Sequence, residues 1–333
     1  MARADLPLAV GPAIRVTSLC GCRSVIPIRL FRYVSCSDAH RSQGRARSAF
    51  RYRWRPCRRR AGHAPACLDG AACLRHRLSA SGEAALAEAH DALQAIPAKA
   101  PVDRYIQPVE GRRKRMLVAD MDSTIIRQEC LDEVALAAGI GPKVAEITER
   151  TMRGELPFEE ALRARIQLLQ GFPQSRLQEV LDKQIVLTPG AKELTATMRA
   201  SGAHTVLVSG GFTFFTSAIA KRAGFEADYG NTFIFTDGGI SGVADPILGQ
   251  NAKLEAMEKE AIQHGVGFEE VIAVGDGAND LAMLKAAGLG VAFHAKPIVA
   301  AEARARIEHG DLTALLFLQG YREEEFVTDI TEI

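Results

Sequence analysis

Hydrophobic and polar residues follow two alternating patterns along the chain from Met116 onward. Short apolar runs bounded by polar or turn residues predict strands at 116–119, 205–208, 271–274 and 290–292. Apolar residues at helical spacing predict helices near 189–200, 213–223, 253–264 and 279–287, the first of them starting at Thr188-Pro189. Strands that alternate with helices predict an α/β fold, here a Rossmann-like parallel sheet with helices on both faces.

Two segments interrupt this alternation. Residues 127–187 carry several helical patterns and no convincing strand, which predicts a small helical cap inserted after the first strand. Between residues 229 and 248, apolar and polar residues alternate on both sides of Asp237-Gly238-Gly239, which predicts a β-hairpin flap. The predicted segments are therefore the core (116–126 and 188–320), the cap (127–187) and a C-terminal tail (321–333).

The formal net charge of +1 over 333 residues conceals two unlike segments. Residues 1–80 hold 16 Arg, no Lys and three acidic residues, a net charge of about +13, which leaves about −12 for residues 81–333. Six of the seven cysteines also lie in residues 1–80. With Cys130 alone, the larger part cannot form a disulfide framework and is typical of a reduced, cytoplasmic protein. No apolar run reaches the ~18–20 residues that span a bilayer, so no membrane partner is expected.

Residues 1–80 lack apolar periodicity long enough for a core, so we expect this Arg- and Cys-rich segment to be poorly ordered. Four interpretations stay open. The composition is typical of an organelle transit peptide, and the Arg-dense stretch 45–60 with its interleaved aromatic residues is typical of an arm that binds RNA or membranes. Cys20-x-Cys22 suggests zinc, but its spacing matches no common zinc pattern. A wrongly translated reading frame of GC-rich DNA would also give arginine without lysine.

Residues 81–115 lead from this segment into the core. A helical pattern starts at Ser81 as N-cap, and prolines at 97, 101 and 108 predict a linker. The basic run 112–115 indicates a solvated approach to the next strand.

Polar residues follow three of the predicted strands. They are Asp120-Met-Asp122-Ser-Thr124, Ser209-Gly210-Gly211 and Gly275-Asp276-Gly-Ala-Asn279-Asp280. Ligands bind beyond the carboxyl ends of parallel strands, so we expect these side chains to converge at one edge of the sheet. Clustered carboxylates repel one another unless a cation lies among them, and all-oxygen ligands suit Mg²⁺. Mg²⁺ usually binds a phosphate together with the carboxylates of the protein, and Lys253 can add a positive charge. The pattern therefore predicts phosphoryl transfer through an attacking carboxylate.

These motifs resemble the four motifs of the haloacid dehalogenase superfamily of phosphotransferases. The first is Asp120-Met-Asp122-Ser-Thr124, the second Ser209-Gly210, the third Lys253, and the fourth runs from Gly275 to Asp280. From about residue 113 to 319 the chain is most similar to the phosphoserine phosphatase family. The resemblance implies Mg²⁺-dependent hydrolysis of O-phospho-L-serine to L-serine and phosphate through an aspartyl-phosphate, the last step of L-serine biosynthesis.

The resemblance also implies roles for individual residues. Asp120 would be the nucleophile, and Asp122 would protonate the leaving serine oxygen and then deprotonate the hydrolytic water. The Mg²⁺ ligands would be Asp120, the backbone carbonyl of Asp122, Asp276 and, in support, Asp280. The phosphate would be held by Ser209, Gly210, Lys253 and Asn279.

Four residues of the cap would select the substrate. The resemblance implies that Glu129 contacts the substrate ammonium, that Arg165 contacts its carboxylate, and that Met152 and Phe158 form an apolar lining. A zwitterion requires one buried anion and one cation, and a guanidinium can fork onto a carboxylate. Each residue also has a plainer interpretation: Glu129 as a first-turn helix acid, Arg165 as a surface partner on its own helix, and the other two as core.

Two other functions stay open. A related phosphatase or phosphotransferase would act on another small phosphomonoester, such as phosphoethanolamine or phosphohomoserine. The Arg-rich segment would make the chain a nucleic-acid-binding protein, although no nucleic acid is expected to be required for phosphatase activity. Many relatives carry a folded βαββαβ regulatory domain, of which residues 81–115 could be only a remnant. Serine feedback through such a domain is not expected, and a homodimer is left open.

Overall fold

The computed structural model describes residues 14–21, 71–78, 102–152, 155–249 and 251–328. Predictions for residues 22–70 and for the helix from Ser81 lie outside these ranges. None of the helices in the described part of the chain is long and apolar enough to cross a membrane.

Six strands form the main sheet: β4 (Met116–Asp120), β5 (His204–Phe212), β6 (Ala227–Asn231), β9 (Val271–Gly275), β10 (Leu289–Phe293) and β11 (Ala305–Ile307). They are all parallel and lie in the order β11-β10-β9-β4-β5-β6. The central strand β4 pairs with β5 and β9, so that Ala119 lies opposite Leu207 on one side and Val274 on the other. The predicted parallel sheet is confirmed.

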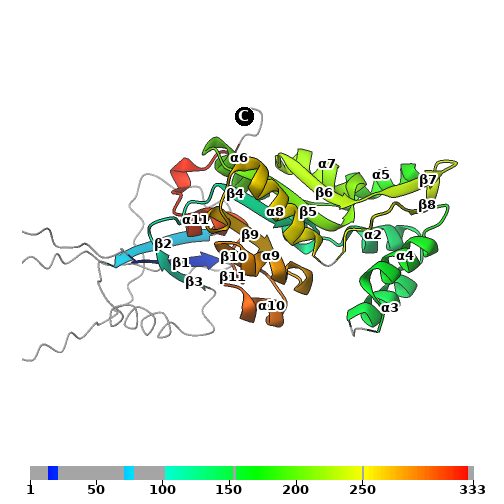
Figure 1. The fold of residues 1–333 in the computed structure, drawn as a ribbon, viewed down its shortest axis with the longest axis horizontal. Helices are drawn as coiled ribbons and strands as arrows, with labels where there is room; N and C mark the ends of the chain where they lie inside the picture. The colour runs from blue at the N-terminus through cyan, green and yellow to red at the C-terminus, as the bar shows by residue number, and fades with distance from the viewer. Residues whose placement is uncertain (1–13, 22–70, 79–101, 153–154, 250, 329–333) are drawn as a thin grey trace, which may run out of the picture.

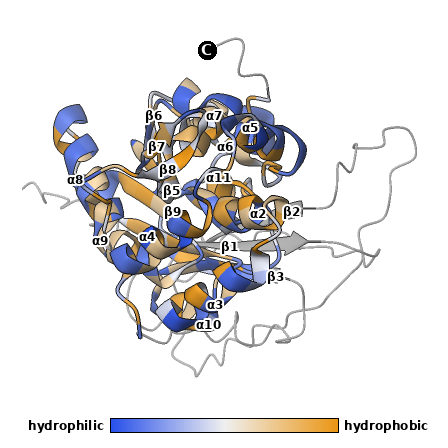
Figure 2. Ribbon diagram, turned by 90° about the vertical axis from the view of Figure 1, so that its right-hand side faces the viewer, coloured by the Kyte–Doolittle hydropathy of each residue, from blue (hydrophilic) through white to orange (hydrophobic). Residues whose placement is uncertain are grey.

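Helices cover both faces of this sheet: α6 (Ala191–Ala200), α7 (Thr213–Ala223), α8 (Ala252–His264), α9 (Leu281–Ala286), α10 (Pro297–Glu302) and α11 (Ala314–Gln319). Successive residues of β4 point to opposite faces. Leu117 and Ala119 pack in the core that includes α6, α7 and α11, whereas Met116 and Val118 pack against α8 and α9. Because both faces are buried, β9 is apolar throughout and β4 is apolar up to the aspartate that ends it. The outer helices, such as α5 and α8, carry much of the hydrophilic blue (Figure 2).

The start of α6 differs from the prediction. The helix begins at Ala191, and Thr188-Pro189-Gly190 form a turn in which the Ala191 N–H donates to the Thr188 carbonyl. Gly190 has φ +82°, a conformation that favours glycine, and a Cβ there would lie 2.6 Å from the backbone nitrogen of Thr313. Gly190 is the N-cap residue, so the helix begins two residues after Pro189.

The cap consists of four helices: α2 (Cys130–Ala137), α3 (Gly141–Met152), α4 (Phe158–Leu168) and α5 (Gln174–Lys183). The flap is the antiparallel hairpin of β7 (Phe233–Thr236) and β8 (Gly239–Val243), as predicted. Asp237 and Gly238 both have positive φ, as a tight two-residue hairpin turn requires. The loop between α4 and α5 is fastened to the flap, because the Gly171 N–H donates to the Ile240 carbonyl at 2.7 Å.

A second sheet, antiparallel and in the order β2-β1-β3, lies at the end of the molecule opposite to α3 and α4 (Figure 1). Its strands are β1 (Ile14–Gly21), β2 (Ala71–Leu78) and β3 (Val102–Pro108), none of which the hydrophobic pattern predicted. The buried carboxylate of Asp103 in β3 accepts N–H groups of Glu308, His309 and Gly310 at 2.7–3.1 Å, which ties this sheet to the core. In the predicted tail, Tyr321 is buried and the Phe326 ring lies 5.0 Å from that of Phe317.

Candidate active site

Three aspartates from two strand ends converge at the carboxyl edge of the main sheet. Asp120 is the last residue of β4, while Asp276 and Asp280 follow β9. One carboxylate oxygen of each lies within 4.8 Å of the other two. Gly275 permits this approach, because a Cβ there would lie 2.4 Å from a carboxylate oxygen of Asp280.

The electrostatics of this carboxylate cluster favour a cation. Burial, and then the charge of Asp280, raises the pKa of Asp120 well above its ordinary value, against the opposing effect of Lys253. The same two causes raise the pKa of Asp276. The charge of Lys253, and at Asp276 also that of Lys296, offsets the three carboxylates only in part, and a divalent cation would neutralise the remainder. Because all three groups are carboxylates, the donor set fits Mg²⁺.

Lys253 lies in the first turn of α8 and points into the cluster. Its Nζ is 2.6 Å from Asp120 Oδ1 and 2.5 Å from Asp280 Oδ1, and the side chain is buried. Burial lowers its pKa, but the charges of the two aspartates outweigh burial and raise that pKa above the ordinary value. The ammonium is therefore charged and fixed beside the carboxylate of Asp120.

Asp122 is oriented by two hydrogen bonds. The Cys130 N–H donates to its Oδ1 and the Ser209 hydroxyl donates to its Oδ2, each at 2.8 Å. Ser209 Oγ in turn accepts the Gly211 N–H at 2.8 Å. A Cβ at Gly211 would lie 3.3 Å from Asp122 Oδ2, so the glycine keeps this side open. The first and second motifs are thus in direct contact.

Glu129 and Arg165 approach the aspartates from the cap. The Ser123 hydroxyl donates to Glu129 Oε1 at 2.7 Å, and burial together with the charge of Asp122 raises the pKa of Glu129 to about 7. Burial lowers the pKa of Arg165, while the nearby charges of Asp132 and Glu129 act in the opposite direction. Among the described residues, no carboxylate forms an ion pair with Arg165, although its Nε donates to the Ala161 carbonyl at 3.3 Å.

Phe158 begins α4 and reaches the second motif. A Cβ at Gly210 would lie 3.3 Å from Phe158 Cζ, which places the ring against the loop after β5. Asn279 is exposed next to Asp280. Met152 is the last residue of α3, and its side chain lies outside what the structure describes. All the other predicted site residues are therefore brought to one region, while the position of the Met152 side chain stays a prediction.

Three polar residues beside the site were not predicted. The Asn231 side chain donates to the Gly210 carbonyl and accepts the Leu248 N–H, each at 2.8 Å. The Thr124 hydroxyl donates to Asp276 at 3.3 Å. Asp132 faces Arg165. Asn231 is the last residue of β6, so prediction of that strand would have drawn attention to it. Thr124 belongs to the first motif, but no role was predicted for it.

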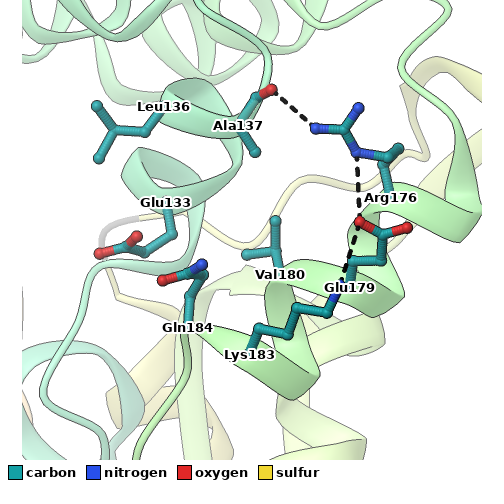
Figure 3. A pocket seen from close by; sticks show the side chains of 8 residues that line it. All are labelled: Glu133, Leu136, Ala137, Arg176, Glu179, Val180, Lys183 and Gln184. Atoms are coloured by element: carbon teal, nitrogen blue, oxygen red, sulfur yellow. Dashed lines mark hydrogen bonds and ion pairs between the residues drawn. The ribbon is translucent and has the colours of Figure 1, made fainter.

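A separate hollow of about 280 Å³ lies between α2 and α5 (Figure 3). Three of its four charged groups pair with one another: Glu179 is 3.7 Å from Arg176 and 3.8 Å from Lys183. None of the predicted site residues is among its lining residues, which are Glu133, Leu136, Ala137, Arg176, Glu179, Val180, Lys183 and Gln184. The hollow is therefore distinct from the carboxylate cluster.

Comparisons with known proteins agree with this geometry. Residues 117–285 match the model of the haloacid dehalogenase-like hydrolases. The phosphoserine phosphatase of Archaeoglobus fulgidus is 38% identical over 237 residues, which cover 70% of this chain and 69% of that protein. The phosphoserine phosphatase of Methanocaldococcus jannaschii is 39% identical over 206 residues, which cover 62% of this chain and 97% of that protein.

A solved substrate-bound phosphoserine phosphatase complex is similar in structure, with a TM-score of 0.58 and 38% identity over 62% of this chain and 98% of that one. The matched part of the chain spans only 52–69% of the length of several curated phosphoserine phosphatases. The segment that matches the family model, residues 117–285, lies within the core, the cap and the flap.

Proposed function

The chain belongs to the haloacid dehalogenase-like hydrolases, and on this premise we propose that it is an Mg²⁺-dependent phosphoserine phosphatase. One observation carries the proposal: an acid, Glu129, and a guanidinium that forms no ion pair within the described residues, Arg165, lie beside the carboxylate cluster at the sheet edge. O-phospho-L-serine has the matching three groups, an ammonium, a carboxylate and a phosphate. The product would be L-serine, formed in the last step of its biosynthesis.

Asp120, Asp276 and Asp280, with the Asp122 backbone carbonyl, would hold the Mg²⁺ ion. The ion would supply positive charge that neutralises the phosphate and lowers the barrier to attack by an anion. Support comes from the raised pKa values of Asp120 and Asp276, whose first cause is burial and whose second is the charge of Asp280, because a bound cation would offset both effects.

Hydrolysis would proceed in two displacements at phosphorus. In the first, an Asp120 carboxylate oxygen forms a bond to phosphorus while the bond to the serine oxygen breaks, and Asp122 gives that oxygen its proton. In the second, water attacks the phosphorus, Asp122 takes a proton from it, and the bond to Asp120 breaks. The two hydrogen bonds that fix Asp122 support its role in both steps.

The remaining residues would hold the substrate. Ser209, Gly210, Lys253 and Asn279 would contact the phosphate oxygens. Glu129 would pair with the ammonium and Arg165 with the carboxylate. Phe158 and Met152 would exclude water above the reacting phosphorus.

The test is phosphate release from O-phospho-L-serine by the full chain. We expect turnover with Mg²⁺, loss of turnover when EDTA removes it, and recovery when Mg²⁺ is restored. Asp120→Asn should reduce kcat at least about a thousandfold, because the amide cannot form the phosphoryl ester. A folded protein that hydrolyses phosphoethanolamine or phosphohomoserine but not phosphoserine would replace this proposal by its rival.

A cytoplasmic location belongs to the same proposal. Cys130 is a free, buried thiol, which is typical of a reducing compartment. Detection of the chain in a cell fractionation would test this location directly.

A further inference from the structure

A second group of metal-ligating side chains lies at the opposite edge of the main sheet from the carboxylate cluster. His204 is the first residue of β5, and its strand runs from there toward Ser209. Glu260 and His264 lie one turn apart near the end of α8, whose first turn carries Lys253. One ligand atom of each of these three side chains, the histidine cluster, lies within 4.8 Å of the other two.

Both imidazole rings place a nitrogen close to the same carboxylate oxygen. Nε2 of His204 is 2.8 Å and Nε2 of His264 is 3.4 Å from Glu260 Oε2. The two rings are stacked, with centroids 3.7 Å apart and planes at 18°. A tetrahedral ion with bonds of about 2.0–2.1 Å holds its ligand atoms roughly 3.3 Å apart. The two nitrogen–oxygen separations lie on either side of that value, and binding would also require the rings to turn out of their stacked arrangement so that both nitrogens point at the ion.

Groups behind the histidine cluster already orient its members. Nδ1 of His204 is 3.3 Å from Glu226 Oε2, which also accepts the Thr205 N–H at 3.1 Å. The Tyr229 hydroxyl donates to the second oxygen of Glu260. A carboxylate behind one ring nitrogen fixes the tautomer that leaves the other nitrogen free for a metal, and this arrangement is typical of zinc sites.

We propose that His204, Glu260 and His264 bind one Zn²⁺ ion, separate from the proposed Mg²⁺ site. Two imidazoles and a carboxylate are ligands that Zn²⁺ takes readily, whereas Mg²⁺ prefers oxygen alone. The side chain of His264 is 35% exposed, so water reaches the fourth position. Bound zinc joins β5 to α8, and these elements carry Ser209 and Lys253 at their other ends.

The experiment measures zinc bound per full-length chain by equilibrium dialysis and metal analysis, in excess Mg²⁺. His264→Gln is compared with wild type and with His309→Gln, a matched change at an exposed histidine outside the cluster. Zinc held by cysteines or by the aspartates would be the same in all three proteins. We expect His264→Gln alone to lose one equivalent.

A second variant tests the site without removing a ligand. Glu226→Gln should keep the stoichiometry but weaken zinc binding about 10- to 100-fold, because the carboxylate behind His204 is lost. Co²⁺ should give the strong visible absorption of a tetrahedral site in wild type, and His264→Gln should lose the part of it that comes from one equivalent of Co²⁺. Circular dichroism checks that both variants fold.

Equal zinc content in wild type and His264→Gln, or unchanged affinity in Glu226→Gln, would overturn the proposal. The cluster would then be an ion-pair network that joins β5, β6 and α8. Neither readout depends on phosphatase activity, so the result stands apart from the fate of the proposed function.

Discussion

The proposed pairing of Glu129 with the substrate ammonium predicts that substrate binding depends on pH near neutrality. Burial and the charge of Asp122 raise its pKa to about 7, so below that pH the neutral acid predominates in the free protein. A neutral acid cannot pair with an ammonium. We therefore expect the KM for phosphoserine to rise as the pH falls from about 8 to about 6.

The control for this prediction distinguishes the titration of Glu129 from that of the substrate phosphate, which also titrates in this range with a pKa of about 6. An aryl phosphate without an amine shares the phosphate titration only and should show a smaller rise in KM. Glu129→Gln should have a high KM at every pH. An identical pH profile for both substrates in the wild type would refute the assignment.

Arg165 and Arg163 offer a matched pair on one helix. Arg163 pairs with the exposed carboxylate of Asp245, whereas Arg165 is turned toward Glu129 and Asp132. Arg165→Ala should lower kcat/KM for phosphoserine about 10- to 100-fold and hardly change it for phosphoethanolamine, which lacks the carboxylate. Arg163→Ala should change neither by more than about twofold, since an exposed ion pair contributes little. Equal losses on both substrates in Arg165→Ala would favour a substrate without a carboxylate.

At the scale of elements, substitution of two glycines distinguishes the cost of backbone strain from the cost of steric overlap. Gly190 and Gly202 have φ of +82° and +80° and flank α6. A Cβ at Gly202 meets nothing within 4 Å, whereas at Gly190 it would lie 2.6 Å from the Thr313 nitrogen. Gly202→Ala should lower the free energy of unfolding by about 1 kcal/mol, the cost of a left-handed residue. Gly190→Ala should lower it by about 3 kcal/mol or more, because the backbone must also move.

Urea denaturation of the two variants measures this difference. Equal losses of stability would mean that the turn before α6 relaxes freely.

The sequence predicted the elements whose own hydrophobic pattern is strong. The continuous apolar runs of β4, β5 and β9 mark strands buried on both faces, and the polar residues after them predicted the site. β6 and β11 were missed because Ala227–Asn231 is half polar and Ala305–Ile307 is very short. Their strand conformation depends on pairing with β5 and β10, which no local pattern records.

The contact between cap and core also lies beyond local pattern. Glu129 and Arg165 could be assigned by resemblance, but Asp132 and Asn231 enter the site through packing alone. The histidine cluster is a similar case, because His204 and His264 are far apart in sequence and meet only where α8 packs against β5.

For the whole molecule, the separation of charge predicts two independent behaviours. Residues 1–80 carry about +13 and residues 81–333 about −12, while every proposed site residue lies between 120 and 280. Contacts with nucleic-acid phosphates would come from the arginines of the first segment, so any RNA binding should weaken steeply as salt rises. The proposed chemistry uses none of those arginines.

We therefore expect the rate of phosphoserine hydrolysis by the full chain to be the same with and without saturating single-stranded RNA at low salt. The experiment uses the full chain because β1 and β2 lie within residues 1–80. These strands pair with each other, and β1 also pairs with β3, so truncation would remove two of the three strands of the antiparallel sheet. Phosphate release measured beside RNA binding, over a series of salt concentrations, checks both parts. Inhibition by RNA that disappears at high salt would show that the basic segment acts on the site, and the two behaviours would not be independent.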